Sequence, residues 1–349
     1  MSAMRTVSIA RLAAADLDPV SPDDVVSFVD LTERADTETV SAAAQRARRS
    51  HRILIGIGSP SENLEVLGES LSFSIDDGPA EGFRSVRVSG VEREVAQIAD
   101  SVRAAPLASM TCNGLLRMAQ TLDVHSALVA ESMAYSTLQS GPEFRGWLAG
   151  RRSCRGSSAC STVQVSRDND RLTIELDRPE VHNAIDAGMR DQLVEALQLA
   201  LVDDTIDEVV LSGRGKSFSS GGDLTEFGST PDPATAHLIR TEHRPGEQIY
   251  RLAERLGTRC VAHVHGAVIG GGLELAAFAG LVVADSNAVF ALPEVSMGLV
   301  PGAGGTVSVS RRIGRWRSAW LMLTGNRIDA ATAERWNLVD RIHTGSPAI

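Results

Sequence analysis

Three consecutive glycines, Gly270 to Gly272, stand in the stretch GAVIGGGLELA (266–276), where the apolar spacing predicts the start of a helix. Glycine costs a helix interior about 1 kcal/mol relative to alanine, so the run must serve something other than helix stability. Backbone without side chains can approach a ligand closely, and the first amides of a helix lack internal partners. Together with the helix dipole, such amides would stabilise a developing oxyanion.

An oxyanion site usually needs a second donor, and the stretch GRGKSFSSGGDL (213–224) is the candidate. It follows an apolar run typical of a buried strand, and it pairs Gly221 and Gly222 immediately before Asp223. A plain glycine-rich turn between a strand and a helix would explain the same residues equally well.

Two glutamates lie close to these glycines in the sequence. Glu274 follows the triplet, and Glu294 lies in the stretch FALPEVSMGLVPGAGG (290–305). Glu274 alone would be a carboxylate that complements a helix N-terminus, and Glu294 alone would be a solvated loop acid. Two carboxylates beside an oxyanion site would suit general acid–base catalysis on a carbonyl substrate, although spacing does not show that they converge.

Other catalytic motifs are incomplete. The GKS at 215–217 lacks the glycine that a phosphate-binding loop needs five residues earlier, where Val210 stands. The serines at 219–220 lack the glycine frame of a nucleophile elbow. His263 and His265 would need further ligands nearby to hold a metal, so we expect no metal and no redox cofactor.

The elements that would position these groups alternate between strand and helix after residue 162. Period-two or short apolar runs predict strands at 171–179, 206–215, 260–269 and twice within 281–294. Helical spacing predicts helices at 187–204, 249–259 and 304–325, besides the helix that the glycines open. This alternation predicts an α/β fold.

Composition narrows the class of protein. The chain has 349 residues and a formal net charge of −10, which argues against nucleic acid as a partner. We see neither a signal peptide nor an apolar run long enough for a membrane span, so we expect no membrane association and a cytoplasmic location. Four scattered cysteines suggest reduced thiols rather than disulfides; they are Cys112, Cys154, Cys160 and Cys260.

The later part of the chain carries phrases of one known family. They are LDRPEVHNAID (176–186), VVLSGRGKSFSSGGDL (209–224), HGAVIGGGLELA (265–276), LPEVSMGLVPGAGGT (292–306) and LTGNRIDAATAERWNLVDRI (323–342). From about residue 172 to 342 the sequence resembles the crotonase superfamily, the enoyl-CoA hydratase/isomerase family. The resemblance implies a spiral of ββα turns with an α-helical trimerisation region, acyl-CoA thioester substrates and a homotrimer or hexamer.

The same resemblance implies roles for individual residues. The oxyanion hole would be the N–H groups of Gly222 and Gly271, and Gly302 would offer an amide near the reacting water. The CoA would lie near the 181–185 stretch and along a loop that consists of Ser220, Gly221, Asp223, Leu224 and Thr225.

Hydratases of the family keep both glutamates, so the resemblance implies hydration of a trans-2-enoyl-CoA to a 3-hydroxyacyl-CoA. Glu274 would activate water for attack on C3, and Glu294 would supply the proton to C2. The alternatives are isomerisation, another crotonase reaction such as thioester hydrolysis or cofactor-free oxygenation, and a non-catalytic acyl-CoA-binding partner subunit.

The domain organisation departs from the family. A Ser-, Gly- and Arg-rich linker is expected at 151–162, between an N-terminal accessory segment (1–150) and a catalytic core (163–349). Family members normally continue past the position of Asp340 with helices that cover the active site. Residues 91–150 resemble that tail, so we hypothesise that the first segment is a shortened, non-catalytic crotonase-like unit whose helices complete the core. An unrelated accessory domain is the alternative.

Overall fold

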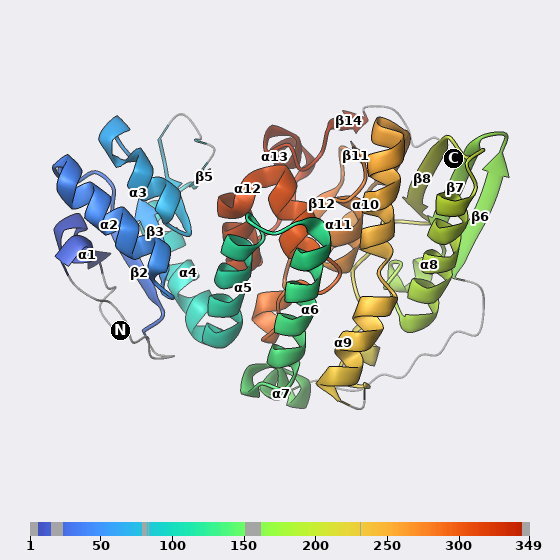
Figure 1. Cartoon of the computed structure of the whole chain (residues 1–349), viewed down its shortest axis with the longest axis horizontal. Helices are drawn as coiled ribbons and strands as arrows, with labels where there is room; N and C mark the ends of the chain where they lie inside the picture. Colours follow the sequence, from blue (N-terminus) through green and yellow to red (C-terminus); the bar gives the residue numbers. More distant parts are fainter. Residues whose placement is uncertain are drawn as a thin grey trace.

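The computed structural model describes residues 6–14, 24–78, 82, 84–150, 162–230 and 232–343. Figure 1 shows a smaller parallel sheet with its own helices, a group of helices in the middle, and a larger α/β part. We refer to the described residues up to 150 as the N-terminal half and to those from 162 onward as the C-terminal half. The predicted linker lies outside the described residues except for its last residue.

The N-terminal half begins with a five-stranded sheet in the order β1-β2-β3-β4-β5, in which every pair is parallel. Its strands are β1 (Thr6–Val7), β2 (Val26–Asp30), β3 (Ile53–Ile57), β4 (Phe73–Asp76) and β5 (Ser85–Arg87). The connecting helices are α1 (Ile9–Ala14), α2 (Thr37–Arg49) and α3 (Glu65–Ser70). Helical crossovers of this kind are what parallel neighbours require.

Helix α2 shows how the sequence specifies these elements. Asp36 caps its N-terminus, because its carboxylate accepts a hydrogen bond of 2.8 Å from the Thr39 amide. The buried residues of the helix recur at a spacing of three and four, which places them on one face; they are Val40, Ala43, Ala44 and Ala47.

Four further helices complete the N-terminal half, as the tail-like sequence predicted. They are α4 (Val91–Ala104), α5 (Pro106–Met118), α6 (Val124–Gln139) and α7 (Pro142–Ala149). Prolines at the first positions of α5 and α7 begin those helices where a missing amide costs nothing. Figure 1 shows α5 and α6 beside α12, between the first sheet and helices α9 and α10 of the C-terminal half.

Two sheets form the C-terminal half. The larger has the order β14-β11-β9-β8-β7-β6 and is parallel except for the β6–β7 hairpin, and the smaller has the order β10-β12-β13. The larger sheet contains β6 (Val163–Asp168), β7 (Arg171–Leu176), β8 (Glu208–Gly213), β9 (Cys260–Val264), β11 (Leu281–Asp285) and β14 (Arg341–His343). The smaller contains β10 (Ala267–Ile269), β12 (Val289–Ala291) and β13 (Ile328–Asp329).

The helices of this half are α8 (Ala187–Val202), α9 (Pro233–Glu242), α10 (Pro245–Leu256), α11 (Gly271–Ala276), α12 (Gly305–Thr324) and α13 (Ala330–Arg335). The predicted α/β class and most predicted elements are therefore confirmed. The single strand predicted at 260–269 is wrong. It is two strands in two different sheets, because Gly266 adopts φ +55° and turns the chain between β9 and β10.

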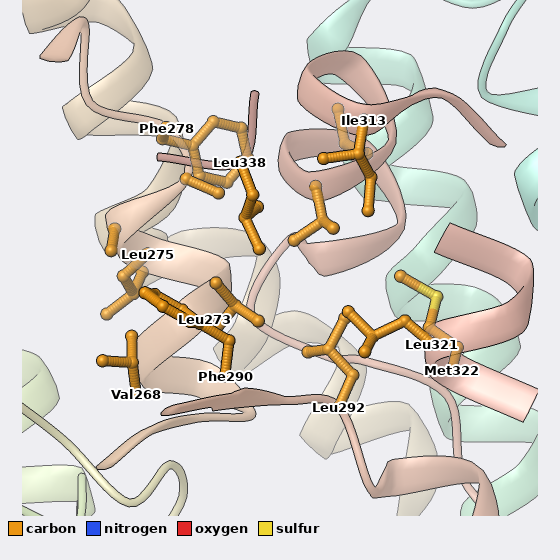
Figure 2. Packing of buried hydrophobic residues seen from close by; sticks show 14 of the residues in the cluster. Val268, Leu273, Leu275, Phe278, Phe290, Leu292, Ile313, Leu321, Met322 and Leu338 are labelled. Atoms are coloured by element: carbon orange, nitrogen blue, oxygen red, sulfur yellow. The ribbon is translucent and has the colours of Figure 1, made fainter. Parts of the chain in front are cut away.

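The two halves share one hydrophobic core. Strand β2 sends Phe28 into this core, while its neighbour Val29 faces a smaller, separate core against α1, α2 and α3. Helix α12 carries Ile313, Leu321 and Met322 into the shared core, beside β10, α11 and β12 (Figure 2). The Sγ of Cys112 on α5 lies 3.6 Å from the Sδ of Met322.

Polar contacts also join the halves along α12. The Arg315 guanidinium donates a 2.8 Å hydrogen bond to the Leu71 carbonyl. The indole of Trp320 donates a 2.8 Å bond to the carboxylate of Glu94, which is itself buried. Buried polar groups need hydrogen-bond partners, and here each half of the chain supplies partners for buried groups of the other half. None of the helices in the described ranges is long and apolar enough to cross a membrane.

We predict that deleting residues 1–150 makes the remainder insoluble or aggregated, because the apolar face of α12 would lose α5 and β4. Expression of residues 151–349, followed by size-exclusion chromatography beside the full chain, measures this. A soluble, correctly assembled and fully active remainder would contradict the shared core.

Candidate active site

The loops that follow β8 and β10 lie side by side. Ser219 forms a parallel bridge with Val268, and the Ile269 amide donates a 3.0 Å hydrogen bond to the Ser219 carbonyl. This pairing brings the two glycine clusters to the same place, although helices α9 and α10 and strands β9 and β10 separate them in the sequence. The two glycine clusters therefore lie close together in space.

The amides of Gly222 and Gly271 are both available. Neither donates a hydrogen bond to any residue that the structure describes. The Gly222 nitrogen lies 3.7 Å from the point at which a Cβ on Gly271 would stand, and a Cβ on Gly221 would lie 2.9 Å from the Ile269 carbonyl oxygen. Two unsatisfied donors thus lie close together in backbone that admits no side chain at 221.

Gly270 and Gly272, on either side of Gly271, must each be glycine for a different physical reason. Gly270 adopts φ +50°, and a Cβ there would lie 2.5 Å from Oε1 of Glu294. A Cβ on Gly272 would lie 2.6 Å from the Cβ of Ser219. The triplet therefore leaves room for a carboxyl group on one side and for the neighbouring loop on the other.

Buried polar side chains hold the loop that carries Gly222. The amide nitrogen of Asn183 donates to the carbonyls of Ser217 and Phe218, at 2.8 and 3.1 Å. The buried Arg178 guanidinium lies 3.1 Å from the carboxylate of Asp223. The Asp223 side chain, predicted to be near CoA, is therefore occupied in fixing this loop.

Glu274 is buried in the first turns of α11. Its Oε2 accepts hydrogen bonds of 2.7 Å from the amides of Ala303 and of Gly305. Burial raises the pKa of the Glu274 carboxyl to about 7, and these amides, with that of Gly302, oppose the rise. The side chain therefore binds the loop ahead of α12 and titrates near neutral pH.

Glu294 is 9% exposed, so it is not a solvated loop acid. Its Oε2 has no hydrogen-bond partner among the described residues. Burial, and next the negative charge of Glu274, raise the pKa of the Glu294 carboxyl well above its usual value. Burial therefore favours the neutral form of both carboxyl groups, and backbone amides oppose this most at Glu274.

Two adjoining cavities meet at these groups. One contains about 870 Å³ of empty space and the other about 660 Å³, and both figures include space that is open to solvent. Gly222, Gly271 and Gly302 line both cavities, while Asp223, Glu274 and Glu294 line the larger. Four predicted residues are outside the described lining of these cavities, namely Ser220, Gly221, Leu224 and Thr225.

The N-terminal half contributes a third carboxyl group that the sequence analysis missed. Glu131 on α6 accepts hydrogen bonds from the Gly304 amide at 2.7 Å and from the Thr306 amide at 2.9 Å. Burial, and next the charge of Glu274, raise the pKa of Glu131 to about 8. Glu131 and Glu274 thus bind alternate amides of the segment 303–306.

The sequence analysis also missed two other residues near the site, Tyr135 on α6 and Arg240 on α9. A Cβ on Gly302 would lie 2.6 Å from the ring of Tyr135, and Arg240 lies over the same ring at 4.4 Å. The tail-like phrase LVAESMAYSTL (128–138) signalled a helix near the site, but not which face it presents. Among the described residues no cluster of His, Cys, Asp or Glu could hold a metal ion.

The C-terminal half thus combines alternating strands and helices with two free amides and two buried glutamates along one cavity. Residues 167–346 match the family model described as enoyl-CoA hydratase/isomerase. The chain belongs to the enoyl-CoA hydratase/isomerase family.

Individual relatives match over about half of the chain. The chain is similar to a 2,3-dehydroadipyl-CoA hydratase of Escherichia coli, with 34% identity over 52% of this chain and 69% of the relative. Among solved structures, it resembles an enoyl-CoA hydratase of Thermoplasma volcanium (34% identity, 53% and 72% of the two chains, TM-score 0.46). An enoyl-CoA hydratase of Mycobacterium smegmatis matches similarly (30% identity, 52% and 70%, TM-score 0.48).

The raised pKa of Glu131 predicts a pH-dependent stability. A folded-state pKa of about 8 against an ordinary 4.5 means that the folded protein retains a proton which the unfolded chain releases. The stabilisation is complete below the unfolded pKa and is lost as pH rises toward 8, so the free energy of unfolding should fall across that interval. Urea denaturation over this pH range should show a shallower fall for Glu131→Gln.

The matched control is Glu195→Gln, because Glu195 is exposed on α8. Its curve should run parallel to that of the wild type. Identical slopes for the wild type and Glu131→Gln would contradict the buried, protonated state of Glu131.

Proposed function

We propose that this protein hydrates trans-2-enoyl-CoA thioesters to 3-hydroxyacyl-CoA thioesters, without a metal or redox cofactor. The observation that carries the proposal is the pair of buried glutamates, which line one cavity with two unsatisfied amides and differ in their hydrogen bonds: Oε2 of Glu274 binds loop amides, and Oε2 of Glu294 has no partner among the described residues. Hydration needs a base, an acid and an oxyanion site at once, and this set supplies all three.

The amides of Gly222 and Gly271 would bind the thioester oxygen. Attack of water at C3 moves electron density onto that oxygen, so an enolate charge develops there. Each preorganised donor of this kind is typically worth about 3–4 kcal/mol in the transition state. The site already holds the donors in place, because neither amide has to break a bond within the protein to receive the oxygen.

The glutamates would divide the proton transfers. Oε2 of Glu274 binds the loop amides, which leaves Oε1 to take a proton from the attacking water. The water oxygen bonds to C3, and Glu294 gives its proton to C2. Glu274 then holds a proton and Glu294 is ionised, and exchange with solvent restores the starting state.

The N-terminal helices have a role in this proposal. Through Glu131, α6 fixes the segment 303–306 that Glu274 also binds. We therefore keep the hypothesis that residues 91–149 serve as the family's helical tail, placed before the core. The CoA loop at 220–225 and assembly as a trimer or hexamer stay predictions.

Replacement of either glutamate tests the reaction. Glu274→Gln and Glu294→Gln should each lower kcat for crotonyl-CoA about 100- to 10,000-fold, because each removes one proton transfer while keeping the shape of the side chain. Loss of enoyl absorbance measures the rate, and Glu195→Gln is the control. Undiminished turnover in either glutamate variant would contradict the assignment. If Glu274→Gln stays active while Glu294→Gln does not, and the product is an enoyl-CoA with a moved double bond, the protein is an isomerase.

A further inference from the structure

Arg240 on α9 is a cation without an ion pair beside the proposed active site. It lines both cavities, together with Gly222 and Gly271. Two other arginines line the smaller cavity, and each has a carboxylate partner, Arg190 with Asp191 at 2.9 Å and Arg244 with Glu247 at 3.4 Å. Arg240 has no carboxylate within 4.0 Å among the residues that the structure describes.

Uncharged groups of α6 hold the Arg240 guanidinium. Its Nε donates to the hydroxyl of Ser132 at 3.3 Å, its Nη2 donates to the hydroxyl of Ser136, and its plane lies over the Tyr135 ring at 4.4 Å. Nη1 makes no hydrogen bond with a described residue. These contacts fix the position of the group without neutralising its charge.

Arg240 is partly shielded from solvent. Burial lowers the pKa of its guanidinium, and electrostatic interactions with Tyr135 and Glu131 oppose that shift. The smaller cavity also has apolar walls, to which Leu128, Ile185 and Leu275 contribute. An aliphatic chain that ends in an anion would satisfy both the walls and the cation.

We propose that Arg240 binds a carboxylate at the far end of the acyl group, so that the preferred substrates are enoyl-CoA thioesters of dicarboxylic acids. This inference rests on the proposed function for its reaction, but not for its binding step. A guanidinium matches a carboxylate in geometry and charge, and Nη1 of Arg240 has no hydrogen-bond partner among the described residues.

A phosphate of CoA is the other anion that such a cation would bind. Arg240 lines the same cavities as the two amides that would hold the thioester oxygen. The phosphates lie at the opposite end of the pantetheine arm from the thioester. The acyl carboxylate is therefore the anion that this position favours, and the two sources are separable by experiment.

Binding of saturated acyl-CoA pairs to the full chain tests the proposal. Adipoyl-CoA and hexanoyl-CoA, or glutaryl-CoA and pentanoyl-CoA, have equal chain lengths and differ in the terminal carboxylate. Calorimetry should show that the wild type binds the carboxylated member about tenfold or more tightly, as expected for a hydrogen-bonded charge pair. Arg240→Met should abolish the preference, and Arg240→Lys, which keeps the charge, should retain part of it.

The control is Arg145→Met, because Arg145 is exposed on α7 and outside the described lining of the cavities. It should keep the wild-type preference. No preference in the wild type, or an unchanged preference in Arg240→Met, would overturn the proposal. Equal weakening of both members of a pair in Arg240→Met would also overturn it, since that result indicates a CoA phosphate.

Thermal unfolding of each variant checks that it is folded. If Arg240→Met does not fold, the comparison of Arg240→Lys with the wild type still measures whether the preference for a carboxylate depends on residue 240. The binding measurement requires no turnover. A carboxylate preference without hydration of any enoyl-CoA would therefore refute the proposed reaction and support the proposed ligand class. Hydration without a carboxylate preference would support the proposed reaction and refute the ligand class.

Discussion

Three carboxyl groups are buried around one short segment, and none of them has an ion pair among the described residues. Glu274 binds the amides of Ala303 and Gly305, and Glu131 binds those of Gly304 and Thr306, so successive amides alternate between two elements. Burying a carboxyl group without a cation is costly unless it is hydrogen-bonded or protonated. Amides around the N-terminus of α12 satisfy two of the groups, while Oε2 of Glu294 has no partner among the described residues, and the proposed chemistry rests on that difference.

This arrangement also explains why the two halves of the chain form one body. Glu131 comes from α6, while Glu274 and the amides come from the C-terminal half. The core that α12 shares with α5 and β4 places α6 against the segment 303–306. Active-site geometry therefore depends on packing that begins at the first sheet, even though the oxyanion donors and both proposed catalytic glutamates belong to the C-terminal half. The α/β class and the family of this half are established independently of that role.

Local sequence signals predicted much of the fold and the centre of the site. The glycine clusters, Glu274 and Glu294 were singled out from the sequence, and the resemblance to the family implied Gly222 and Gly271 as the oxyanion donors. The structure places these four residues along one cavity. The break at Gly266 was missed because a continuous apolar run does not reveal a turn between two sheets. Glu131 and Arg240 were missed for a different reason. Glu131 depends on the face that α6 presents to the segment 303–306, and Arg240 depends on how α9 packs against α6. Both are decided by packing between segments far apart in the sequence.

The most direct test of the proposed reaction follows the atoms of water. Crotonyl-CoA is incubated with the protein in water enriched in oxygen-18 and deuterium, and the product is analysed by mass spectrometry and NMR. The account predicts 3-hydroxybutyryl-CoA with the heavy oxygen at C3 and one deuterium at C2. Heavy oxygen in a released carboxylic acid, or a product with a moved double bond and no heavy oxygen, would contradict it.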